Sequence, residues 1–565
     1  MKKEKIQELI SRMTLEEKAG MCSGADFWHL KGIERLGIPQ VMVTDGPHGI
    51  RKQAEEADHL GINESEEAVC FPAGCATASS FDRDLIRRQG EILGQECQAM
   101  NVSTILGPAM NIKRSPLCGR NFEYYSEDPF VSAEMAAAMI EGVQSKHVGT
   151  SVKHFAANNQ EKRRMTNSSD MDERTLREIY LASFEGAVKK SKPWTVMSSY
   201  NRINGKFVGD SKEYLTDILR EEWGFDGYVV SDWGAVNDRV SSLSAGLDLE
   251  MPPGDYENDR LIVKAVQEGK LDEKTVDLAC ERILDVIFRY TENRDENAVF
   301  EYEKDHKAAA DIAAECMVLL KNDNHILPLN AEKKIAFIGK YAREPRYQGG
   351  GSSHINSWKV ESALEAVKTI PELANVTFAE GYQDEKDEVV KDLQDEAVRT
   401  AADADVAVLF LGLPDNFESE GYDRKHMELP NCQNELVQKI LEVQKHVVVV
   451  LHNGSAVLMP WKDQVEGILE AYLGGEAVGR ATAEILAGKK NPCGRLAETF
   501  PLRLEDTPCY LTYGKGFDNA DYQEGVFVGY RYYTSRKMKT AFPFGYGLSY
   551  TTFEYSDFQL DKKEM

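Results

Sequence analysis

The sequence predicts an α/β protein in which a (β/α)8-like barrel, which need not be complete, is followed by a doubly wound α/β sandwich domain. Three observations support this prediction. The chain has 565 residues, enough for at least two domains. In its first half, short apolar runs alternate with helical patterns, which is typical of βαβ units. In its second half, two longer runs are continuously apolar, as strands covered on both faces are.

The barrel elements begin with an N-terminal helix, because Ile6, Leu9, Ile10 and Met13 are spaced along one helical face. Apolar runs then follow at 40–43, 103–106, 150–152, 195–197 and 228–230, each ending in polar residues or in Gly-Pro. Five such units favour a barrel over residues 1–290, whose active site would lie where the strands end.

We expect a linker at 291–314, because the sequence turns polar after Tyr290. The second domain is predicted at 315–550. Its apolar runs at 406–411 and 447–451 read as buried strands, and helical patterns follow at 436–441 and 477–487. A tail at 551–565 completes the sequence.

Composition excludes several functional classes. Acidic residues number 93 against 67 basic ones, a net charge of −26, which argues against a nucleic-acid or anionic membrane partner. No run of about 18 apolar residues occurs, so no transmembrane helix is expected. Ten cysteines are spread along the chain without a Cys-x-x-Cys pair, which predicts free thiols in the cytoplasm. A homodimer is left open.

The predicted strand ends carry the candidate chemistry. Asp232 ends the run at 228–231 and precedes Trp233; it is read as a nucleophile or acid/base group, or alternatively as a helix N-cap. A barrel would bring it near the cations at other strand ends, which would hold it ionised and bind sugar hydroxyls, or alternatively form salt bridges along the barrel rim. These cations are Arg51, Arg120, Lys153 and His154.

A second carboxylate is expected in the loop at 412–424, which follows a buried strand and is rich in glycine and acidic residues. Such loops bind ligands at the carboxyl end of an α/β sheet, although a merely solvated loop is the alternative. Two carboxylates on opposite sides of a domain crevice would supply the pair that glycoside hydrolysis requires.

The sequence resembles glycoside hydrolase family 3, in particular its bacterial and fungal β-glucosidases. The matching segments follow in order along nearly the whole chain, which makes the match specific. They are MTLEEK at 13–18, DGPHGIR at 45–51, NIKRSPLCGR at 111–120, NFEYYSEDP at 121–129, KHF at 153–155, NNQE at 158–161, MSSYN at 197–201, SDW at 231–233, EGYDR at 420–424 and FGYGLSY at 544–550.

The resemblance implies that Asp232 is the nucleophile and Glu420 the general acid/base of a retaining, exo-acting β-glucosidase. Glu418 competes with Glu420, but the Glu-Gly-Tyr-Asp-Arg register favours Glu420. We expect Asp232 to stay ionised among the cations and the neighbouring carboxylate to raise the pKa of Glu420. The pocket for the terminal sugar would contain Asp45, Arg51, Arg120, Lys153, His154, Arg164, Met197, Tyr200, Trp233 and Ser352, with Ser353 nearly as strong a candidate as Ser352.

Two departures from the family bear on substrate. The stretch at 158–164 lacks the His-Asp pair of the N-acetylglucosaminidases, and Asp45 stands where the pentosidases tend to have Glu, which favours glucose. The alternatives are a β-xylosidase or α-arabinosidase, a glycoside phosphorylase or transglycosidase and, least favoured, a non-catalytic sugar-binding protein. No metal or cofactor is expected. The tail resembles the opening strand of a fibronectin-like domain that many relatives carry.

Overall fold

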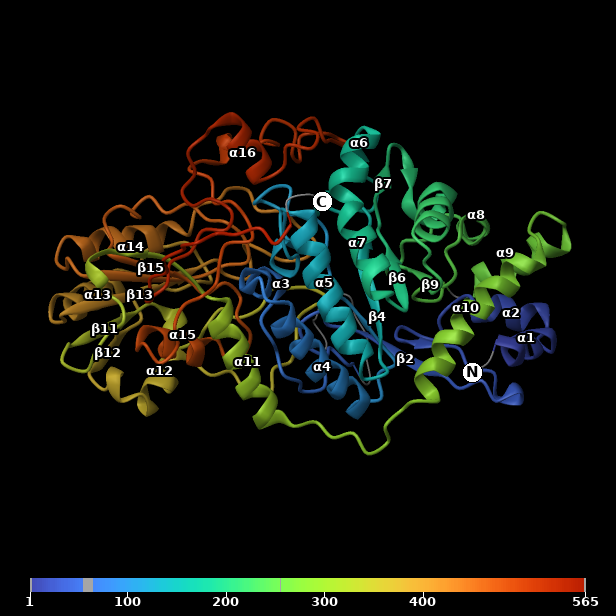
Figure 1. Cartoon of the computed structure of the whole chain (residues 1–565), viewed down its shortest axis with the longest axis horizontal. Helices are drawn as coiled ribbons and strands as arrows, with labels where there is room; N and C mark the ends of the chain where they lie inside the picture. The colour runs from blue at the N-terminus through green and yellow to red at the C-terminus, as the bar shows by residue number, and fades with distance from the viewer. Residues whose placement is uncertain (1–2, 54–64, 255, 563–565) are drawn as a thin grey trace.

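The computed structural model describes residues 3–53, 65–254 and 256–562. Two α/β bodies lie side by side in Figure 1, with the earlier part of the chain (blue to green) on the right and the later part (yellow to orange) on the left. A long loop joins helix α10 to helix α11 along the lower edge of this view.

The first body is built on a six-stranded sheet with the order β1-β2-β3-β4-β6-β9. Strand β1 is antiparallel to β2, and all the following pairs are parallel. The five predicted apolar runs form its five parallel strands. The strands are β1 (His29–Leu30), β2 (Val41–Asp45), β3 (Thr104–Leu106), β4 (Gly149–Phe155), β6 (Thr195–Ser198) and β9 (Tyr228–Ser231).

Isolated bridges join the two edges of this sheet. Val230 of β9 bridges to Leu249, Glu250 bridges to Ser23, and Gly24 bridges to Leu30 of β1. The backbone therefore closes into a ring. Two of its segments, 23–24 and 249–250, are joined to their neighbours by single bridges and are not full strands. This confirms the predicted barrel and locates the part that is incomplete.

Helices surround this ring, and α4 packs against α5, which in turn packs against α7. The predicted N-terminal helix is α1. The helices are α1 (Lys3–Ser11), α2 (Leu15–Met21), α3 (Gly74–Thr77), α4 (Arg83–Ala99), α5 (Pro129–Gln144), α6 (Glu173–Thr175), α7 (Ala182–Ser191), a π-helical segment (Glu213–Glu222), α8 (Arg239–Ala245), α9 (Glu257–Gln267) and α10 (Glu273–Thr291).

The second body contains a six-stranded sheet with the order β10-β15-β14-β13-β11-β12. All neighbours are parallel except β10 and β15. Strands β13 and β14 coincide with the two predicted apolar runs and are buried along their whole length, as expected for a sheet covered on both faces. The strands are β10 (Val318–Asn322), β11 (Ile335–Ile338), β12 (Val376–Ala379), β13 (Val406–Gly412), β14 (Val447–His452) and β15 (Gly467–Glu470).

The helices of this body are α11 (Tyr302–Cys316), α12 (Ala363–Ala366), α13 (Lys391–Ala402), α14 (Asn431–Leu441) and α15 (Val478–Leu486). Helix α11 begins inside the predicted linker at 291–314 and covers its part from residue 302 onward. Its stripe of small apolar residues, among them Ala309, Ile312 and Ala313, is buried in the core of the second body. The boundaries 1–290 and 315–550 stay predictions.

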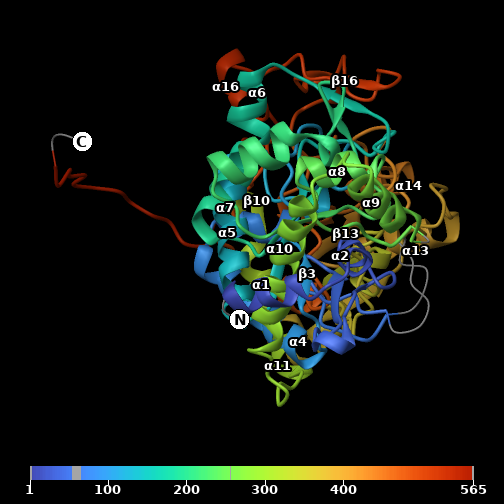
Figure 2. The same ribbon diagram turned by 90° about the vertical axis from the view of Figure 1, so that its right-hand side faces the viewer.

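The C-terminal segment returns to the barrel. Strand β16 (Asn519–Asp521) joins β5 (Ser168–Asp170), β7 (Arg202–Ile203) and β8 (Lys206–Phe207) in a small sheet, and α16 (Tyr530–Arg536) follows. Residues 551–562 project from the body in Figure 2. They are exposed and form no strand. The resemblance of this tail to the opening strand of a further domain stays a prediction.

All ten cysteines lie in the described part of the chain. They are free thiols, and only Cys493 among them is exposed. Helices long and apolar enough to span a bilayer are absent from residues 3–53, 65–254 and 256–562.

Candidate active site

Asp232 lies directly after strand β9, at the carboxyl end of the barrel. Its Oδ1 atom accepts a hydrogen bond of 2.8 Å from the backbone N–H of Trp233. Its Oδ2 atom lies 3.9 Å from Nε2 of His154 and has no hydrogen-bond partner among the described residues. One oxygen is thus anchored while the other is available to a ligand, which is the arrangement that a nucleophile needs.

Hydrogen bonds and ring contacts fix Tyr200 and Trp233 beside Asp232. The Tyr200 hydroxyl donates to the Trp233 carbonyl over 3.1 Å, and the Trp233 indole N–H donates to the Phe27 carbonyl over 3.0 Å. The rings of Trp233 and Trp28 lie 5.4 Å apart. Trp233 is therefore held as a rigid apolar wall next to the carboxylate.

The other predicted barrel residues gather at the same strand ends. Lys153 on β4 donates to Asp45 at the end of β2 over 2.6 Å, and both side chains are buried. Arg51 bridges back to Asp45 through its backbone. Met197 is buried on β6, the strand between those of Lys153 and Asp232.

Glu420 comes from the second body and meets cations of the barrel. Its Oε1 atom accepts from Arg164 over 2.8 Å and from Arg120 over 3.4 Å. Its Oε2 atom accepts from the backbone N–H of Ser352 over 2.7 Å, and the Ser352 carbonyl accepts from Arg51 over 3.3 Å. Ser352 thus acts here through its backbone, as the link between Glu420 and the barrel.

Glu418 points elsewhere. It is 1% exposed and accepts from the backbone N–H of Gly454 over 2.7 Å, inside the second body. The cations that act on it are Arg346 and Arg424. The geometry therefore separates the two glutamates: Glu420 faces the barrel cations, and Glu418 does not bond to them.

The loop that carries Glu420 is fastened to the barrel by two carboxylates that the sequence analysis left without a role. Glu161 accepts from the Gly421 backbone N–H over 2.8 Å. Asp423 accepts from the backbone N–H groups of Glu161 (2.9 Å), Lys162 (3.0 Å) and Gly119 (3.2 Å). Both residues belong to motifs that carry the family resemblance, and their presence there was the available signal.

The electrostatics reverse the expected order of the two carboxylates. Burial raises the pKa of Asp232 to about 6, against the lowering effects of Arg120 and Arg164. Burial also acts to raise the pKa of Glu420, but Arg120, Arg164 and the hydrogen bonds from Ser352 outweigh it and hold the pKa well below the usual range. The expectation that Glu420 has the raised pKa is wrong for the free site, because the two arginines bond to Glu420 and not to Asp232.

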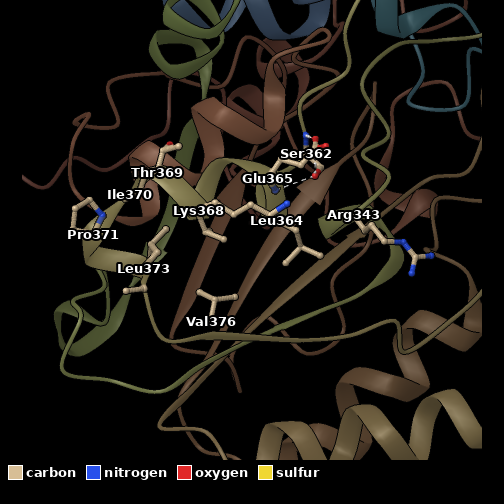
Figure 3. Close-up of a pocket in the computed structure, with 12 residues that line it drawn as sticks. Arg343, Ser362, Leu364, Glu365, Lys368, Thr369, Ile370, Pro371, Leu373 and Val376 are labelled. Carbon is tan, nitrogen blue, oxygen red and sulfur yellow. Dashed lines mark hydrogen bonds between the residues drawn. The ribbon is translucent and has the colours of Figure 1, made fainter.

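A separate groove of about 810 Å³ lies in the second body. Figure 3 shows its walls, which come from Arg343, residues 362–374 and strand β12. None of the predicted site residues lines it. In the part of the chain that the structure describes, three or more His, Cys, Asp or Glu side chains do not gather as a metal site would require.

A barrel with a carboxylate at a strand end, facing a second carboxylate from an α/β sandwich across buried cations, defines a glycoside hydrolase. Residues 25–286 match the glycosyl hydrolase family 3 N-terminal domain, and residues 317–550 match the C-terminal domain of the same family. The chain belongs to glycosyl hydrolase family 3.

Curated relatives agree with this assignment. The chain is 55% identical to thermostable beta-glucosidase B of Acetivibrio thermocellus, over 99% of this chain and 74% of that protein. It is 46% identical to an exo-alpha-(1->6)-L-arabinopyranosidase of Bifidobacterium longum, over 96% of this chain and 73% of that protein.

Solved structures are equally similar. The family 3 beta-glucosidase of Bifidobacterium adolescentis superposes with a TM-score of 0.91 at 45% identity, covering 96% of this chain and 78% of that one. Beta-glucosidase 3B of Thermotoga neapolitana, solved in complex with glucose, gives a TM-score of 0.90 at 36% identity, covering 99% of this chain and 85% of that one.

Proposed function

We propose that this protein is a retaining, exo-acting β-glucosidase in which Asp232 is the nucleophile and Glu420 the general acid/base. The observation that carries the proposal is that carboxylates from two different bodies face the same pair of cations. Arg120 and Arg164 both bond to Glu420, and both act on the pKa of Asp232.

In the first half-reaction, the unpaired Oδ2 of Asp232 attacks the anomeric carbon of the terminal glucosyl residue. The bond between that carbon and the glycosidic oxygen breaks, and Glu420 transfers a proton to the departing oxygen. Trp233 excludes water from one side of the sugar, while Asp45 and Lys153 bind its hydroxyl groups.

In the second half-reaction, Glu420 takes a proton from water, and the resulting hydroxide attacks the anomeric carbon and releases Asp232. The low pKa of Glu420 in the free site keeps the group ionised, which this step requires, and at the same time makes the carboxylate a weaker base. The first step requires the opposite state, so the acid must gain its proton against Arg120 and Arg164.

Glucose is the proposed sugar because Asp45, being shorter than the Glu expected in pentosidases, leaves room for a hydroxymethyl group. The name of the Bifidobacterium longum relative keeps a second candidate, an α-L-arabinopyranosidase, in the comparison. β-D-Xylose is glucose without that group, so the kcat/KM ratio of the β-glucoside to the β-xyloside measures the space beside Asp45. The α-L-arabinopyranoside also differs from the β-glucoside in the configuration at C4, so it tests a second feature of the pocket.

The experiment is a panel of nitrophenyl glycosides, namely β-glucoside, β-xyloside, α-L-arabinopyranoside and β-N-acetylglucosaminide, assayed with and without phosphate. We expect the β-glucoside to be the best substrate and phosphate to have no effect. Asp232→Asn keeps the acceptor for the Trp233 N–H but loses the nucleophile, so activity should fall on the order of 10⁴-fold or more. Equal rates for the two proteins would refute the assignment of Asp232.

Azide distinguishes the two glutamates. Glu420→Ala removes the acid/base, so the glycosyl-enzyme forms slowly from unactivated glycosides and is hydrolysed slowly. Azide needs no base and should restore turnover of an activated glucoside, with glucosyl azide as the product. Glu418→Ala is the matched control and should show no such rescue. Rescue of the Glu418 variant alone would transfer the role to Glu418.

The proposed setting is the reducing cytoplasm of a bacterial cell, which ten free thiols and the bacterial origin of the first relatives support. The partner is a small glycoside, with no nucleic acid and no membrane. A homodimer stays a prediction, which light scattering of the purified protein would test.

A further inference from the structure

Arg164 connects two carboxylates through a single nitrogen atom. Its Nη1 donates to Glu420 Oε1 over 2.8 Å and to Glu161 Oε2 over 2.7 Å. Glu161 is buried, and its Oε1 atom has no hydrogen-bond partner among the described residues. The guanidinium charge of Arg164 is therefore shared between Glu420 and a second carboxylate, that of Glu161.

Glu161 also controls where Glu420 lies. Its Oε2 atom accepts from the N–H of Gly421, the residue directly after Glu420. From the other side, Asp423 accepts from the N–H of Glu161 itself. The Glu161 carboxylate thus binds the backbone of the Glu420 loop at Gly421, and the Asp423 carboxylate of that loop binds the backbone of Glu161.

We propose that Glu161 is a positioning residue that holds Glu420 in place through Gly421 and offsets the charge that Arg164 directs at it. This inference rests on the proposed function of the same site. It supplies what the first half-reaction lacks, namely a negative group that weakens the hold of Arg164 on the acid/base and so favours the protonated acid.

The charged surroundings support this role. Glu420 interacts with two cations, Arg120 and Arg164, with two other acids, Asp232 and Glu161, and with Tyr200. Arg120 also pairs with Glu123. Lys153 and His154 lie on the nucleophile side. Burial raises the pKa of Glu161 to about 7. Glu161 is therefore mainly ionised above neutral pH, where the acid/base must keep its proton.

The test is Glu161→Gln in the full-length chain, since glutamine keeps an oxygen that can accept from Gly421 but loses the charge. Arg164 then acts on Glu420 undiminished, so Glu420 loses its proton at lower pH. We expect the basic limb of the kcat profile, which reports the enzyme–substrate complex, to move to lower pH by about one unit. For nitrophenyl β-glucoside or cellobiose, kcat should fall roughly 10–100-fold. For a dinitrophenyl glucoside, whose leaving group needs no acid, kcat should change little.

Glu127→Gln is the matched control. Glu127 is equally buried, its pKa is likewise raised by burial to about 7, and it accepts from Thr499 and Tyr530 away from Arg164. The Glu127→Gln variant should keep the basic limb of the kcat profile at the wild-type pH.

Two outcomes for the Gln variant would overturn the inference: an unshifted limb, or an equal loss of kcat for both leaving groups, which indicates structural support alone. If that variant does not fold, Glu161→Asp replaces it. The shorter acid keeps the charge but loses reach to Gly421, so the limb should hold while kcat for cellobiose falls; a shifted limb or an unchanged kcat would refute the role. A wild-type protein inactive on every glucoside would instead refute the proposed function.

Discussion

The two carboxylates that we propose as catalytic are placed by different kinds of structure. Asp232 directly follows β9, a buried strand paired on both sides, and its anchor is the N–H of the very next residue. Glu420 lies in a loop between β13 and α14, and its anchors come from Arg120, Arg164 and Ser352, which are distant in sequence.

This difference has a physical consequence. The sheet fixes the position of Asp232 without help from the second body. The Glu420 loop, in contrast, is held by its hydrogen bonds to the barrel, which Glu161 and Asp423 make. Substitutions that disturb the contacts of the Glu420 loop should therefore affect the acid/base steps and leave the nucleophile intact. The predictions below test this separation.

The largest effect is expected from Gly351→Ala. A Cβ atom there would lie 2.4 Å from Cβ and 2.8 Å from Oε2 of Glu420, so Glu420 must move away from Ser352 and Arg164. We expect kcat/KM for nitrophenyl β-glucoside to fall on the order of 10²-fold or more, with little change for the dinitrophenyl glucoside.

Gly421→Ala is the matched control for backbone strain. Its φ is +98° against +102° for Gly351, but nothing lies within 4 Å of its Cβ position. Both variants carry the left-handed penalty, and only Gly351→Ala adds the collision. Equal losses in the two variants would show that strain, not the contact with Glu420, is responsible.

A smaller effect is expected from Asp423→Ala, which removes the acceptor of three barrel N–H groups. The loop should loosen without any direct change at Glu420, so we expect kcat for unactivated glucosides to fall about tenfold and Tm to fall by a few degrees. Asp415→Ala serves as a control, because this exposed residue of the same loop pairs with Arg346 of the second body and not with a barrel N–H group. A loss of Tm without any loss of kcat would mean that the hydrogen bonds of Asp423 stabilise the fold but do not position Glu420.

The pH dependence of the nucleophilic step tests the surroundings of Asp232. Burial raises the pKa of Asp232 to about 6, and the protonated carboxyl cannot attack. For a dinitrophenyl glucoside, whose leaving group needs no acid, we expect kcat/KM to decline as pH falls through about 6, by about tenfold per unit well below it. A limb near the ordinary value of about 4 would mean that the cations outweigh burial, as the sequence analysis expected.

The sequence predicts the barrel side of the site better than the loop side. Asp232, Lys153 and Asp45 could be located because apolar runs mark strands and strand ends of a barrel converge. The resemblance supplied Glu420, but the choice against Glu418 becomes physical only when Glu418 is seen bonded to Gly454.

What could not be predicted are contacts that depend on loop conformation. Nothing in the local pattern around Glu161 shows that its carboxylate binds the backbone of Gly421, 260 residues later. The order of the two pKa values failed for the same reason, since it depends on which carboxylate the two arginines contact. Helix α11 was missed because charged residues surround its small apolar stripe.

The smallest effect on activity is expected at a third contact between the two bodies, around His306 on α11. Its Nδ1 lies 2.6 Å from Glu476 and its Nε2 lies 3.4 Å from Glu361, while Glu476 also accepts from the Cys70 N–H of the barrel side over 3.1 Å. Burial lowers the pKa of His306, but the hydrogen bonds that its ring donates to both glutamates outweigh this and raise the pKa to about 9.

Because the pKa of His306 is raised in the folded protein, its stabilisation is fully present below the unfolded value of about 6.5 and is lost as pH rises towards 9. His306→Gln should therefore lower Tm by a few degrees at pH 6 and by progressively less up to pH 9, while kcat stays unchanged. Thermal melts and nitrophenyl glucoside assays across this range measure both. A loss of kcat that follows the loss of Tm across this pH range would show that packing between the bodies also positions Glu420, in addition to the hydrogen bonds of Glu161 and Asp423.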